Sequence, residues 1–130
     1  MVGEVIIMPH VVLEGSLNIK GLNNFNVSLR SNGTIIKIDE LFINVAENRL
    51  LAKTVVVENG KPISFYLDVM LKGNSITVRL DDLTAPEEKS DGVKMSIALM
   101  ARLLQRHGNL SISRTNISDQ IAKIDAIIQR

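Results

Sequence analysis

Cysteine and tryptophan are absent from the sequence, which has only three prolines, three phenylalanines and one tyrosine. A chain without cysteine has no thiolate nucleophile, no cysteine-ligated zinc and no disulfide framework. No apolar stretch approaches the roughly 20 residues of a membrane-spanning helix. Residues 1–4 also lack the basic region of a signal peptide. We therefore expect a soluble protein, cytoplasmic by default.

An excess of charge of either sign is also missing, because 15 lysines and arginines face 14 aspartates and glutamates. The net charge of +1 gives little long-range attraction for nucleic acid or anionic lipid. The few aromatic side chains offer little surface on which bases could stack. We therefore expect no nucleic-acid partner, and we do not expect contact with a membrane surface.

Motifs that carry known chemistries are absent too. No phosphate-binding loop, dinucleotide fingerprint or nucleophile elbow occurs in the sequence. The two histidines, His10 and His107, lie far apart and have no partner at a metal-binding spacing. We expect neither a metal nor a cofactor, and we assign no catalytic residue.

The apolar content of the chain is sufficient for one folded domain. Hydrophobic residues make up 45% of the 130 positions, and a chain of this length buries roughly two-thirds of the surface that it exposes when unfolded. We expect a single domain over 1–130, with an antiparallel β-meander in 1–83 and a helical part in 84–130.

Three dipeptides predict two-residue hairpin loops, because asparagine and glycine tolerate a positive φ. Each loop sets a register in which one face is aliphatic, and around the first and third loops the other face is polar. Around the third loop, Leu67 faces Leu80 on one side of the sheet, and Asp68 faces Arg79 on the other. A shift by one residue would mix the two faces, so this separation favours the registers. The three loops are Asn32-Gly33, Asn59-Gly60 and Gly73-Asn74.

In the strand after the first of these loops, the alternation of apolar and polar residues shifts by one position. Its apolar positions are even-numbered up to Ile38 and odd-numbered from Leu41. A straight strand would move one of the two sets into water. The pattern therefore predicts a bulge near Asp39-Glu40.

The N-terminal part continues the same plan. Residues 11–19 alternate as a strand, and residues 21–24 return the chain towards the next one. Residues 4–8 form a further strand, which Pro9 ends. The sequence thus predicts six or seven short antiparallel strands joined in order along the chain.

A helix over 93–107 follows the meander. Its start is capped either by Thr84, which has capping-box spacing to Glu87, or by Ser90. Gly108 ends it. Its apolar stripe covers about half of the circumference. The stripe consists of Val93, Ile97, Met100, Leu103 and Leu104, with Leu99 at its edge.

Two shorter elements complete the chain. Residues 110–113 form a short strand, and Asn116 or Ser118 caps a last, short helix. The apolar stripe of this helix consists of Ile117, Ile121, Ile124 and Ile128.

The fold class that follows is α+β, with a six- to seven-stranded antiparallel sheet packed against the long C-terminal helix. A wide, twisted sheet tends to curl, so its concave side holds the helix and leaves room for a ligand. The alternative is that aliphatic side chains fill the space between sheet and helix. The first functional hypothesis is a non-enzymatic module that binds an apolar or lipid-like small molecule. Its lining residues would be Leu67, Val69, Val78, Leu80, Ile97, Met100 and Leu104.

The outer face of the sheet also carries apolar side chains. Such patches usually have a cover, here either the last helix or a second copy of the chain. The second hypothesis is therefore a structural or assembly protein that forms a homo-oligomer or binds a protein partner through this face. The interface residues would be Leu51, Val55, Val57, Tyr66 and Met70.

An acidic group is the third candidate. Asp68, Asp81 and Asp82 lie near Arg79 and Tyr66 in the predicted register. Paired carboxylates can perform acid–base catalysis or bind a hard cation. Solvated ion pairs across neighbouring strands are the alternative. An enzyme or cation site there ranks below the two binding hypotheses.

Overall fold

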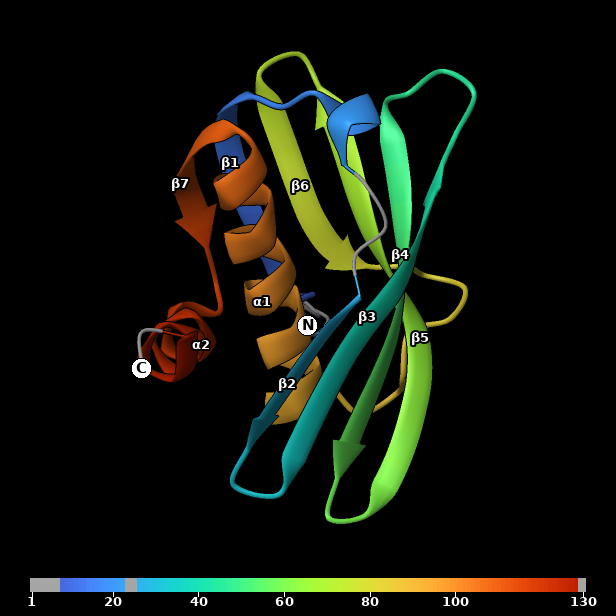
Figure 1. Cartoon of the computed structure of the whole chain (residues 1–130), viewed down its shortest axis with the longest axis vertical. Coiled ribbons are helices and arrows are strands. Elements are labelled where there is room, and N and C mark those ends of the chain that lie inside the picture. The colour runs from blue at the N-terminus through green and yellow to red at the C-terminus, as the bar shows by residue number, and fades with distance from the viewer. Residues whose placement is uncertain (1–7, 23–25, 129–130) are drawn as a thin grey trace, which may run out of the picture.

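The computed structural model describes residues 8–22 and 26–128. A seven-stranded antiparallel sheet curls around one long helix, which confirms the α+β class, the curved sheet and the two C-terminal helices (Figure 1). The elements in chain order are β1 (His10–Ser16), the short 3₁₀ helix η1 (Ile19–Gly21), β2 (Val27–Ser31), β3 (Thr34–Ile43), β4 (Arg49–Glu58), β5 (Lys61–Lys72), β6 (Ser75–Leu80), α1 (Asp91–His107), β7 (Asn109–Thr115) and α2 (Ser118–Ile128).

The three predicted hairpin loops are confirmed. Asn32, Asn59 and Gly73 adopt φ values of 48°, 53° and 59°, the left-handed conformation that such loops require. Strands β2 to β6 follow one another across the sheet as a meander. Leu67 lies opposite Leu80, as the register predicted. The aliphatic face of the meander therefore points to one side along its whole width.

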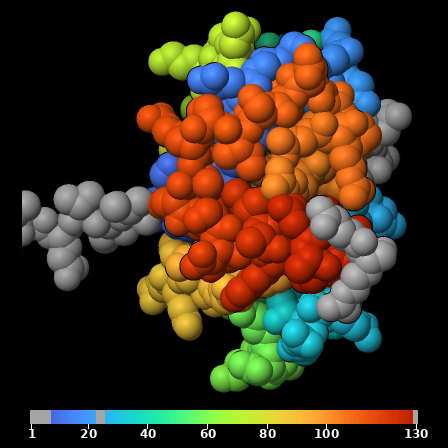
Figure 2. Space-filling view, turned by 90° about the vertical axis from the view of Figure 1, so that its left-hand side faces the viewer, coloured from blue at the N-terminus to red at the C-terminus, as the bar shows by residue number. Residues whose placement is uncertain are grey.

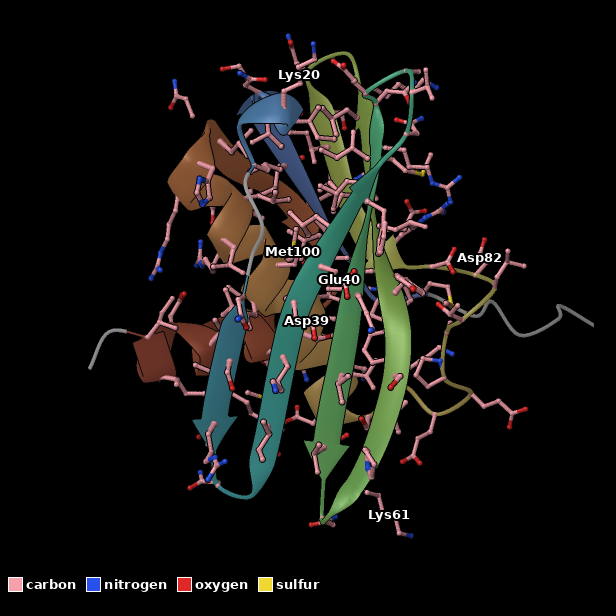
Figure 3. All side chains as sticks on the ribbon, turned by 45° about the vertical axis from the view of Figure 1, so that its right-hand side comes forward. Lys20, Asp39, Glu40, Lys61, Asp82 and Met100 are labelled. Atoms are coloured by element: carbon pink, nitrogen blue, oxygen red, sulfur yellow. The ribbon has the colours of Figure 1, made fainter. Side chains whose placement is uncertain are left out.

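The predicted bulge in β3 is also confirmed. Ile38 lies opposite Thr54, and Glu40 lies opposite Lys53, so that Asp39 has no partner across β4. Figure 3 labels Asp39 and Glu40 at this point of the strand. The extra residue turns Leu41 back towards the core, against which it packs.

The position of β1 differs from the expected simple order. The strand lies between β6 and β7 instead of next to β2. Val11 and Leu13 lie opposite Val78 and Ile76, and all four side chains are buried. The aliphatic face of β1 thus extends the core face of β6, which pairing with β2 would not do. The seventh strand, β7, follows α1 in the chain and pairs with β1.

The expected N-terminal strands need two corrections. β1 ends at Ser16, and Ile19 enters the core from η1 instead of from a strand. The strand predicted for 4–8 falls mostly on residues 1–7, which lie outside the described residues. Met8 itself precedes β1 and belongs to no strand.

Helix α1 lies on the concave side of the sheet (Figure 1). Ser90 is its cap, because the Ser90 hydroxyl accepts a hydrogen bond from the N–H of Val93 (3.2 Å). Thr84, the other predicted cap, lies in a turn before the helix. Gly108 ends the helix where the chain passes close to the backbone of β1. A Cβ at this position would lie 2.7 Å from the carbonyl oxygen of Ser16. The predicted stripe is buried: Val93, Ile97, Leu99, Met100, Leu103 and Leu104.

Helix α2 packs against α1 and not against the outer face of the sheet. Figure 2 shows it lying beside α1 and below β7 on one side of the molecule. Arg102 of α1 binds both carboxylate oxygens of Asp125 of α2, at 2.8 and 2.7 Å. The idea that the last helix covers the outer face is therefore wrong. Its buried side chains are Ile121 and Ile124, and Ile117, which directly precedes the helix, is buried as well.

In the part of the chain that the structure describes, no helix is long and apolar enough to cross a membrane.

Candidate functional site

The seven residues predicted to line a ligand cavity are brought together in the core between the sheet and α1. Each side chain is 1% exposed or less. None of the seven lines any of four surface pockets found among the described residues. Figure 3 shows one of them, Met100, on the helix side of the sheet. An apolar ligand between sheet and helix stays a prediction.

The five predicted interface residues lie on the opposite, convex side of the sheet. Leu51, Val55 and Val57 of β4 alternate with the buried positions of that strand, and their cross-strand partners on β5 also face outwards. Tyr66 is half-buried, and Met70 is 37% exposed. The register of the hairpin therefore places all five on one surface.

Two further apolar side chains, those of Phe42 and Leu83, join this surface, whereas Ile43 lies opposite Leu50 at the end of β3 and therefore faces the core side of the sheet. Phe42 is 48% exposed, Ile43 is 38% exposed and Leu83 is 94% exposed. The Phe42 ring meets the ring of Tyr66 edge to face, with a centroid distance of 6.2 Å. The parity change at the β3 bulge was the available signal for Phe42, since it turns this side chain outwards.

A pocket of about 420 Å³ opens among these side chains. We call it the convex-face pocket. Its walls combine apolar groups with one guanidinium, one carboxylate and one amide. The lining residues are Phe42, Ile43, Asn44, Arg49, Leu51, Asp81 and Leu83.

An ion-pair cluster lies beside the convex-face pocket. Arg49 donates two hydrogen bonds to Asp68, from Nε at 2.9 Å and from Nη2 at 3.0 Å, and Arg79 Nε donates a third at 3.4 Å. The two guanidinium groups leave Asp68 only 1% exposed although it faces outwards. The hydrogen bond and the charge of Asp68 raise the pKa of Arg49. The sequence register found Asp68 with Arg79 but did not place Arg49 beside them.

Asp81 takes part in a different set of contacts. Its carboxylate accepts a hydrogen bond from the hydroxyl of Thr84 (2.9 Å), and its N–H donates a hydrogen bond to the carbonyl of Tyr66 (2.9 Å). Asp82 is exposed on the same loop, which passes outside β5 (Figure 3). The three aspartates thus lie near one another without sharing a centre. Within residues 8–22 and 26–128, no group of three or more His, Cys, Asp and Glu side chains is placed to hold a metal ion.

Comparison with protein-family models, with curated proteins and with solved structures finds no match to this chain.

Proposed function

We propose that this chain is a non-enzymatic assembly protein that binds a second copy of itself through the convex face of its sheet. The observation that carries the proposal is the set of large apolar side chains around the convex-face pocket. Phe42 and Leu83 line the pocket, Met70 lies on the same face of the sheet, and each of the three is at least 37% exposed. Exposed apolar surface of this kind, rimmed by polar groups, marks binding sites.

The chain does not cover this face with its own last helix. Helix α2 packs on α1, and the Arg102–Asp125 ion pair holds it there, on the other side of the sheet. The intramolecular cover that the sequence allowed is therefore used elsewhere. This supports a cover that comes from another molecule.

The charges of the face favour a second copy as that molecule. In a two-fold interface one patch meets itself, so it must offer both members of each complementary pair. The convex-face pocket is lined by the guanidinium of Arg49 and by the carboxylate of Asp81. Lys53 and Glu40, which pair at 3.7 Å, add a further cation and anion on β4 and β3. A patch of a single sign would repel its own copy.

Neither of the other functions has a specific observation in its favour. The core residues proposed for an apolar ligand are buried, and of the aspartates proposed for catalysis or cation binding, Asp68 is engaged with Arg49 and Arg79 and Asp81 with Thr84. Both remain hypotheses, as does the location in the cytoplasm.

Sedimentation velocity over a wide range of protein concentration tests the proposal. Wild-type protein should shift from one to two chains as concentration rises, by mass action. Val55→Asp should weaken this association because it places a charge in the apolar patch, and Met70→Lys serves as a second variant at a more exposed site. Ala122→Asp, on the exposed side of α2, is the matched control. A wild-type chain that stays monomeric at every concentration contradicts the proposal.

A further inference from the structure

Leu83 is held in an unusual position for a large apolar side chain. It occupies the third position of the turn Asp81–Thr84, which the Thr84 N–H closes by donating to the carbonyl of Asp81 (3.2 Å). At that position its side chain is 94% exposed. An apolar side chain of this size gains nothing in the isolated chain from such exposure.

The turn is tied to the sheet at both of its ends. Asp81 donates its N–H to the carbonyl of Tyr66, and the Thr84 hydroxyl accepts the N–H of Tyr66, both at 2.9 Å. The same hydroxyl donates to the Asp81 carboxylate at 2.9 Å. These bonds fix the turn on β5 before any partner arrives. A side chain presented in this way loses little conformational entropy on binding.

The convex-face pocket opens directly beside this turn. Leu83 forms part of its rim, while Phe42, Ile43 and Leu51 supply the other apolar walls. Because Leu83 remains almost fully exposed, its side chain does not fill the pocket that it borders. Its turn is bonded to Tyr66 and cannot tilt inwards without breaking those bonds. The protein thus carries a projecting apolar group and an apolar hollow side by side.

We propose that two copies associate about a two-fold axis with Leu83 of each copy inserted into the convex-face pocket of the other. This inference rests on the proposed self-association and adds the contact that drives it. A projection and a hollow next to each other on one face match under a two-fold rotation, because each copy then supplies both halves of two identical contacts. Arg49, in the hollow, belongs to the residue types that dominate binding energy in interfaces, and Phe42 belongs to those that are enriched there.

The polar lining of the pocket fits the same geometry. Arg49 uses Nε and Nη2 for Asp68, and its side chain is 46% exposed. The inserted turn carries Asp82, an exposed carboxylate, next to Leu83. Under the two-fold, the carboxylate of Asp82 in one copy approaches the guanidinium of Arg49 in the other. Apolar insertion and charge pairing therefore act at the same contact.

The first experiment replaces the projecting group. Leu83→Asp should weaken the dimer by roughly thirtyfold or more, the usual effect of losing a dominant interface residue. The folded monomer should be unaffected, because Leu83 packs little against its own chain. Val45→Asp is the matched control: Val45 is a fully exposed apolar residue outside the pocket lining, and its substitution changes the charge equally. Dimer affinity is read from sedimentation, and folding from thermal unfolding.

A mixing experiment tests the reciprocal insertion itself. Leu51→Arg fills the pocket with a charged side chain, so this variant should also fail to dimerise alone. A mixture of Leu83→Asp and Leu51→Arg chains should form heterodimers. One contact is then native, and at the other the introduced carboxylate meets the introduced guanidinium. Native mass spectrometry resolves the two chains by mass.

The outcomes separate this inference from the proposed function. If the wild type dimerises and Val55→Asp disrupts the dimer, but Leu83→Asp has no effect or the two variants fail to pair, the insertion is wrong and convex-face assembly survives. If the wild type is monomeric throughout, both are wrong. Loss of the dimer in Leu83→Asp, with recovery on mixing, supports both.

Discussion

The carboxylate of Glu58, at the end of β4, accepts a hydrogen bond from the N–H of Gly92 in the first turn of α1, with an Oε2 to N distance of 3.0 Å. The other carboxylate oxygen of Glu58 accepts a hydrogen bond from the hydroxyl of Ser90, which caps the helix. A carboxylate at this end of a helix satisfies free N–H groups and opposes the positive end of the helix dipole. The contact joins the sheet to the helix that covers its concave side.

Gly92→Ala should destabilise the protein because a Cβ at this position would lie 2.5 Å from Cδ of Glu58. Overpacking of this kind costs about 1–3 kcal/mol of unfolding free energy. In a Glu58→Ala background the same change should stabilise the protein by up to about 1 kcal/mol, since alanine is the better helix former. Urea unfolding of the four variants gives both values. Equal effects in the two backgrounds would show that Glu58 does not limit this position.

Asp125→Asn should loosen α2 from α1. The substitution removes the negative charge of Asp125, whose two carboxylate oxygens both bind Arg102. Bidentate ion pairs of this kind are among the stronger surface interactions. We expect a loss of about 1 kcal/mol and faster hydrogen exchange confined to α2. Asp119→Asn, on the exposed first turn of the same helix, is the control. Uniform exchange along the chain would argue against a local role for the pair.

Asp68→Asn should lower the unfolding free energy by about 2 kcal/mol, because a buried carboxylate that accepts three hydrogen bonds is replaced by a weaker acceptor. Asp82→Asn, one of its neighbours in the predicted acidic group, should change stability by no more than about 0.5 kcal/mol since this side chain is exposed. Chemical denaturation compares the two. Similar losses would contradict the separate roles that the structure gives to these aspartates.

Asp91 links α1 to α2 through Gln120 and Lys123, both at 2.9 Å. Partial burial raises its pKa, but the hydrogen bonds and charge of these partners outweigh it and bring the pKa below 3.8. A lowered folded-state pKa adds stability above the unfolded-state value, and this stability is lost as pH falls through the folded-state pKa. The link should therefore weaken only below about pH 3.8. A carboxyl NMR titration should give a midpoint below that of Asp91 in a Lys123→Ala, Gln120→Ala variant; equal midpoints would refute the link.

Local patterns predicted much of the sheet. Asparagine and glycine at the hairpin loops set the registers, and the parity change around Asp39 located the bulge. The neighbour of β1 was not predictable in this way because β2 and β6 both offer aliphatic faces to which a strand could pair. The docking of α2 likewise depends on Arg102 and Asp125 meeting across two helices, which no local spacing signals.

The candidate site was predicted in part. Alternation in β4 and β5 placed Leu51, Tyr66 and Met70 outside the core. Leu83 was missed because its exposure results from bonds between the turn Asp81–Thr84 and Tyr66, which only the folded chain brings together. Periodicity also shows which side chains face inwards, but it does not show whether they fill the space between sheet and helix.

Everything proposed for this protein depends on whether the convex face joins two copies of the chain. Native mass spectrometry of the purified protein, beside a denaturing spectrum of the same sample, tests it most directly. We expect a species of twice the 14.3 kDa chain mass whose share grows with concentration and which is lost in Val55→Asp. A single-chain mass at every concentration would contradict it, and an added mass that leaves on denaturation would favour an apolar ligand instead.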